Sequence, residues 1–98
     1  ASRRKSGDDS ETQIEAVRRA LSEVETREQQ IASLLKSARA RLEAAQEAGN
    51  RAEAQAQQRL INELEAHLRA QSTDAVRLSE KLGALESALA EQQAAERR

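Results

Sequence analysis

Cysteine, proline, methionine and aromatic residues are all absent from this chain, and only three of its 98 residues are glycine. Without cysteine, the chain cannot rely on a disulfide framework. A catalytic domain of this length normally needs glycine-rich turns and polar loops, and the sequence has almost none. Leucine, isoleucine and valine together supply only 17 residues, which is too few for an ordinary globular core.

The residue patterns that carry enzyme chemistry are missing as well. His67 is the only histidine, and without cysteine or a second histidine it has no partners for a metal site, so we expect a surface residue. No nucleophile–base set and no glycine-rich phosphate loop is visible. We therefore expect no enzyme activity, no catalytic residue, no cofactor and no metal ion.

Charge and hydropathy argue against two further classes of partner. The net charge is −1, and the basic residues are spread among nearly equal numbers of acids with no stacking aromatic, so we expect no nucleic-acid binding. The longest purely apolar runs are a few residues, against the ~20 that span a bilayer. Both signs of charge occur on the helix faces, unlike those of a membrane-surface helix. A cytoplasmic location is the default expectation.

What the sequence does contain is a heptad pattern rich in alanine, glutamate, arginine and leucine. Apolar residues recur in steps of three and four, which is the seam of a coiled coil. The first run consists of Ile14, Val17, Leu21, Val24, Ile31, Leu35, Ala38, Leu42 and Ala45, with Glu28 at one step. The second run consists of Ala54, Ile61, Leu64, Leu68, Ala75, Leu78, Leu82, Leu85 and Leu89, with Gln71 at one step.

The two heptad runs are out of phase, and the stretch around Gly49 and Asn50 separates them. An antiparallel hairpin that turns between these two residues removes the conflict, because Ile14 then faces Leu85 and every following pair joins an a position to a d position. The sequence therefore predicts an all-α coiled coil, folded as an antiparallel helical hairpin.

The residues at the break suit a turn. Gly49 fits the left-handed position that follows a helix, and Asn50 fits the cap that begins the next one. Glu53 stands where it could complete a capping box with Asn50. The alternative is one continuous helix in a parallel two-stranded coiled coil, because a glycine inside a helix costs only ~1 kcal/mol.

Polar and charged positions also favour the hairpin. It places Glu28 opposite Gln71, so that the two polar residues of the seam can partner each other, as buried polar groups require. The predicted edge pairs are Arg18 with Glu86, Arg27 with Asp74, and Arg39 with Glu65. A parallel dimer offers only one good pair, Lys81 with Glu86. Such pairs contribute about 0.3–0.5 kcal/mol each, so they select an arrangement more than they stabilise it.

The sequence also suggests where the helices begin and end. We expect a flexible basic tail over 1–9, a first helix over 10–48, a turn at 49–50, a second helix over 51–95 and a frayed end over 96–98. A capping box that begins at Ser10 supports the start of the first helix. Arg3-Arg4-Lys5 followed by Ser6 is compatible with a kinase site or a nuclear-import patch, but three basic residues are also common in a solvated tail.

Leu34 and Leu60 lie beside the seam, on one edge of the predicted hairpin, and form the candidate edge for a partner. The seam has few large residues, so we expect self-association, most simply a dimer of hairpins that forms a four-helix bundle.

The heptads over about 10–93 resemble those of coiled-coil rods in cytoskeletal, centriolar and tethering proteins, a generic resemblance that names no family. The sequence thus predicts a structural self-association or scaffold module of a larger protein. The alternatives are an adaptor that recruits another helical protein and a regulatory arm.

Overall fold

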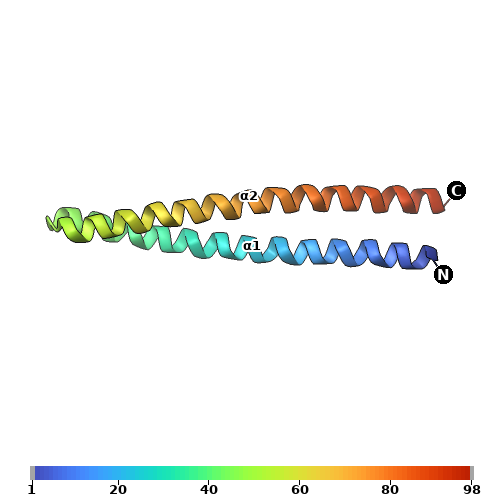
Figure 1. Ribbon diagram of the computed structural model, residues 1–98, viewed down its shortest axis with the longest axis horizontal. Helices are drawn as coiled ribbons and strands as arrows, with labels where there is room; N and C mark the ends of the chain where they lie inside the picture. Colours follow the sequence, from blue (N-terminus) through green and yellow to red (C-terminus); the bar gives the residue numbers. More distant parts are fainter. Residues whose placement is uncertain (1, 98) are drawn as a thin grey trace. The chain divides into compact units, whose positions relative to one another are not determined.

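Two long helices make up the fold. The computed structural model describes the backbone of residues 2–97 and the side chains of residues 9–97. Helix α1 covers Ser2–Glu47 and helix α2 covers Arg51–Glu96, and no strand occurs within residues 2–97 (Figure 1). The chain turns back between them, so the fold is the predicted all-α helical hairpin. The alternative of one continuous helix is wrong, because the helix is interrupted at residues 48–50.

The C-terminus of α1 is closed by a Schellman motif, in which Gly49 adopts a left-handed backbone with a φ of 69°. The N–H of Gly49 donates to the carbonyl of Gln46 at 3.1 Å, and the N–H of Asn50 donates to the carbonyl of Ala45 at 2.9 Å. These two bonds satisfy carbonyl groups that a helix end otherwise leaves open. Glycine is favoured at this position because a side chain disfavours the left-handed region.

Asn50, whose N–H completes this motif, also caps the N-terminus of α2. Oδ1 of Asn50 accepts a hydrogen bond from the backbone N–H of Glu53 at 3.1 Å, which confirms the predicted N-cap. The second half of the predicted capping box is wrong. The backbone N–H of Asn50 is already bonded to Ala45, and Oε1 of Glu53 instead accepts from Nε2 of Gln57 at 2.8 Å.

The start of α1 needs a correction. The helix begins at Ser2 and not near Ser10, so the predicted start of the first helix is wrong. The flexibility of the basic tail over 1–9 stays a prediction, and Ala1 lies outside the described residues. No proline interrupts this segment, and the basic residues in it have good helix propensity, so the helix continues through the predicted cap. At the other end α2 includes Glu96, and Arg98 again lies outside the described part of the chain.

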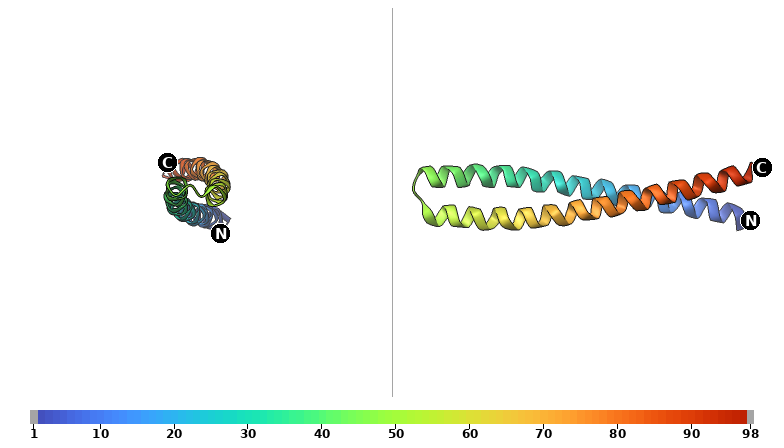
Figure 2. Two further views of the ribbon diagram at one scale, coloured as in Figure 1. Left: turned by 90° about the vertical axis from the view of Figure 1, so that its left-hand side faces the viewer. Right: turned by 90° about the horizontal axis from the view of Figure 1, so that it is seen from above.

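The helices pack as two compact units. The first, Glu25–Thr73, contains the turn and is called the turn unit below. Figure 2 shows its two helical segments side by side in both views. Its core is a cluster of four buried side chains, two from each helix: Leu35, Ala38, Ile61 and Leu64. Half-buried Ile31, Leu42 and Leu68 pack against the cluster. Each large side chain buried in this way stabilises the fold by about 1.5–3 kcal/mol.

The second unit, called the terminal unit below, consists of the part of α1 that ends at Val24 and the part of α2 that begins at Asp74. Among its side chains within residues 9–24 and 74–97, the buried ones all come from α1: Ile14, Val17 and Val24. The leucines that α2 contributes are only half-buried: Leu78, Leu82, Leu85 and Leu89. The packing in this unit therefore covers one side of the seam more completely than the other.

Candidate functional site

The heptad seam is the feature from which the candidate site is built. The structure buries or half-buries every predicted seam residue: Ile14, Val17, Leu21, Val24, Glu28, Ile31, Leu35, Leu42, Ile61, Leu64, Leu68, Gln71, Leu78, Leu82, Leu85 and Leu89. Packing between the two helices therefore occupies most of the seam, and the apolar residues beside it are the more exposed ones, such as Leu34 and Leu60.

A small apolar groove lies beside the seam in the turn unit. Leu34 on α1 and Leu60 on α2 line its walls, and they remain 56% and 38% exposed. Its floor is formed by Ala38 and Leu64, which are buried in the core cluster. The structure thus brings the two predicted edge leucines together, one from each helix. They leave a small apolar surface on the turn unit.

The polar groups of the groove are few. Ser37 and Arg41 complete the lining, and both side chains are exposed. The hydroxyl and the guanidinium can position a polar group of a partner, but the surface between them is aliphatic. This chemistry suits the apolar face of a helix better than a small polar substrate.

Two of the three predicted edge pairs are present, one in each unit. In the terminal unit, Nη2 of Arg18 lies 2.8 Å from Oε2 of Glu86. In the turn unit, Nη2 of Arg39 lies 3.5 Å from Oε2 of Glu65. These contacts confirm the antiparallel pairing inside each unit. The third pair, Arg27 with Asp74, joins residues of different units and stays a prediction.

The polar step of the seam is arranged differently from the prediction. Oε2 of Glu28 accepts a hydrogen bond from Oγ of Ser72 at 2.9 Å, so its partner is not Gln71. Oε1 of Gln71 is buried and has no hydrogen-bond partner among the described residues. The heptad pattern specifies which residues face the other helix. It does not specify that the hydroxyl of Ser72, one position after Gln71 in α2, donates to the carboxylate of Glu28. The predicted Glu28–Gln71 contact is therefore corrected.

Two residues of interest were not singled out in the sequence. Gln57 is only 8% exposed, and its Oε1 has no hydrogen-bond partner among the described residues. The heptad spacing could have identified Gln57 as a seam residue, because it lies three residues after Ala54 and four residues before Ile61. Val76 is 57% exposed on α2 of the terminal unit. It stands outside the seam pattern, which gave no reason to select it.

The described part of the chain holds neither a cluster of metal ligands nor a long apolar segment. No three histidine, cysteine, aspartate or glutamate side chains there come together as metal ligands. None of the described helical segments has an apolar window long enough to cross a bilayer. His67 is exposed on α2. Comparison with protein-family models, with curated proteins and with solved structures finds no match for this chain.

Proposed function

We propose that this chain is a structural self-association module, in which the groove lined by Leu34 and Leu60 binds the same groove of a second copy. The exposed pair of leucines, one from each helix, is the observation that carries this proposal. Two grooves that face each other would bury four leucine side chains between two hairpins. The product is a four-helix bundle, the arrangement in which helical hairpins most simply share a core.

The small core of the hairpin supports the proposal. Within residues 9–97, eight apolar side chains are buried, two of them alanines, and none of the larger ones is less than 2% exposed. Ordering each residue of a helix costs about 1–2 kcal/mol in backbone entropy, which a thin core offsets poorly. A second hairpin supplies the additional apolar contact without any change in the seam.

The test is sedimentation equilibrium of the full chain over a wide range of concentrations, with Leu34→Gln as the variant. Glutamine keeps the helix propensity but removes the branched apolar end. A dimer contains two copies of Leu34, so we expect its dissociation constant to rise by roughly 10- to 100-fold, in line with the transfer of two partly buried leucines.

Val76→Gln is the matched control. Val76 is as exposed as Leu34, but it belongs to the other unit, so its replacement should leave the dissociation constant unchanged. A wild-type chain that stays monomeric at every concentration contradicts self-association, whereas an equal effect of the two substitutions contradicts binding through the groove. If the wild-type chain stays monomeric, the groove would instead bind a helix of another protein, which is the adaptor function. A scaffold role in the cytoplasm, at the cytoskeleton, a centriole or a tether, stays a prediction.

A further inference from the structure

The two rims of the Leu34/Leu60 groove carry charges of opposite sign. On α1, Arg27 and Arg41 lie two helical turns before and after Leu34, which places all three residues on the same face of the helix. Both arginines are exposed, and Arg41 lines the groove itself. The rim that α1 contributes is therefore basic.

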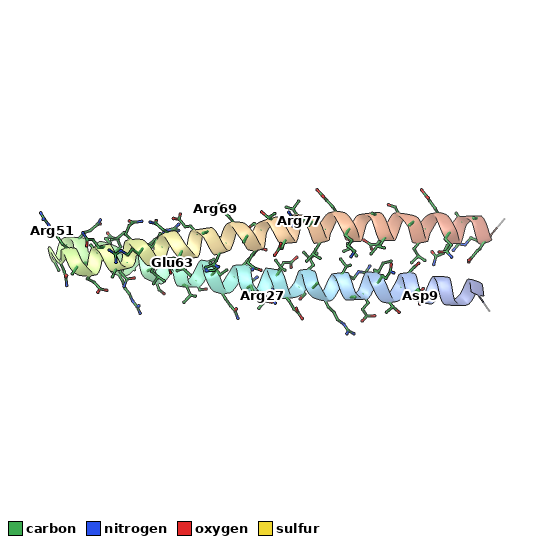
Figure 3. The ribbon with its side chains drawn as sticks, viewed as in Figure 1. Asp9, Arg27, Arg51, Glu63, Arg69 and Arg77 are labelled. Atoms are coloured by element: carbon green, nitrogen blue, oxygen red, sulfur yellow. The ribbon has the colours of Figure 1, made fainter. Side chains whose placement is uncertain are left out.

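The rim that α2 contributes is acidic. Glu53 lies two turns before Leu60 and Glu63 lies one turn after it, and both are exposed. His67, two turns after Leu60, is the remaining titratable group on this strip. Figure 3 shows Arg27 on α1 and Glu63 on α2, so the two signs come from different helices. The apolar floor thus separates a basic edge from an acidic one.

A two-fold dimer can bring this surface against its own copy in two ways. If the two-fold axis runs parallel to the helices, α1 of one copy lies over α2 of the other, and both turns lie at the same end. If the axis runs across the helices, α1 lies over α1, α2 lies over α2, and the turns point in opposite directions. The first arrangement joins basic to acidic rims, and the second joins like charges on both sides.

We infer that the second copy binds in the first arrangement, with α1 over α2 and with the two turns at the same end. This inference rests on the proposed self-association through the groove. Leu34 and Leu60 line one groove and therefore lie at the same level along the hairpin. Arg41 and Glu53 each lie two turns closer to the turn, so each Arg41 comes to the level of Glu53 of the second copy. Complementary rim charges of this kind fix the orientation of an interface more than its affinity.

The energetic test reverses one charge at a time. Arg41→Glu and Glu53→Arg each create two like-charge contacts in the homodimer, and we expect the dissociation constant to rise roughly three- to tenfold at low salt, the range of exposed pairs. A mixture of the two variants restores both contacts between unlike chains, so the heterodimer should bind about as tightly as the wild-type homodimer. The effect should shrink at high salt.

The geometric test uses two single-cysteine chains of different mass, one with Arg41→Cys and one with Glu53→Cys. Oxidation of the mixture should give mainly the mixed disulfide, which two cysteines form when their Cα atoms lie within about 7 Å. Glu43→Arg and Arg59→Glu, exposed outside the groove, serve as charge controls and should change the dissociation constant less than twofold. Circular dichroism checks that each variant keeps its helix content.

The outcomes separate this inference from the self-association on which it rests. A wild-type chain that never dimerises overturns both. A wild-type dimer that becomes tighter or stays unchanged on each charge reversal retains self-association and overturns the arrangement. The same conclusion follows if single-cysteine chains carrying Arg41→Cys cross-link mainly with each other, because that result places α1 over α1.

Discussion

Nη2 of Arg18 lies 2.8 Å from Oε2 of Glu86, although the two residues are 68 positions apart in the sequence. The contact joins α1 to α2 in the terminal unit at a pair that the antiparallel register predicts, and Arg39 with Glu65 does the same in the turn unit. The Arg18 and Glu86 side chains are 60% and 45% exposed, so solvent screens their attraction. A contribution well below ~1 kcal/mol follows, and removal of the pair should weaken the choice of register more than the stability.

The antiparallel pairing of the terminal unit can be measured directly. Spin labels on Ala16→Cys and Ala84→Cys replace two exposed alanines on different helices of this unit. Packed helices lie about 8–10 Å apart, so labels that project from them should be separated by less than ~30 Å. Each sample is diluted with unlabelled chain, so that only distances within one molecule contribute. One continuous helix would place the labels ~100 Å apart, at 1.5 Å per residue.

We expect Gly49→Ala to lower the free energy of unfolding, because Gly49 occupies the left-handed position of the turn. Gly49 has a φ of 69°, and a side chain in the left-handed region costs about 1–2 kcal/mol. The space around its Cβ position is open, so the loss would come from the backbone and not from a clash. Urea unfolding followed by circular dichroism should therefore show a decrease of about 1 kcal/mol in the free energy of unfolding.

Gly83→Ala is the matched substitution with the opposite expected sign. Gly83 lies inside α2, and no atom lies within 4 Å of an added Cβ. Alanine restricts the unfolded chain and is favoured over glycine in a helix by ~1 kcal/mol, so the free energy of unfolding should rise by about 0.5–1 kcal/mol. If Gly49→Ala and Gly83→Ala change stability in the same direction, the assignment of the turn to Gly49 is wrong.

The cap of α2 makes a third prediction about stability. Asn50→Ala removes the acceptor for the N–H of Glu53 and should lower the free energy of unfolding by about 1 kcal/mol. Asn50→Asp keeps an oxygen at the same position, and its negative charge is favourable at the start of a helix. The aspartate variant should therefore be as stable as the wild type in the same urea titration. Equal losses in both variants would mean that the amide nitrogen, and not Oδ1, stabilises the turn.

The heptad pattern predicted most of this fold because its period specifies which side of each helix is buried. Gly49 and Asn50 then placed the turn, since a left-handed residue and a cap have clear sequence preferences. The same pattern could not identify the partner of Glu28, because Ser72 lies outside the seam and reaches the carboxylate from a neighbouring position. Helix ends are weakly specified when no proline is present, which explains the early start of α1 at Ser2.

The candidate site was predictable only in part. Leu34 and Leu60 stand beside the seam, so their shared edge could be read from heptad positions, and the structure places both in one groove. Opposite charges on the two rims require knowledge of which helix contributes each residue. The hairpin supplies that information because it brings Arg41 and Glu53 to one edge from opposite sides of the turn.

Gln57 is a position where a change should stabilise the hairpin. Its side chain is buried in the turn unit, Nε2 donates to Glu53, and Oε1 has no hydrogen-bond partner among the described residues. A buried amide oxygen without a partner costs about 1–3 kcal/mol, and leucine at the same step of the seam would bury apolar surface instead. Gln57→Leu should therefore raise the free energy of unfolding by about 1–2 kcal/mol in urea titrations.

Gln55→Leu, the same change at an exposed position of α2, should shift the free energy of unfolding by less than ~0.5 kcal/mol. If the two variants are equally stable, the amide of Gln57 is not a destabilising feature of the seam.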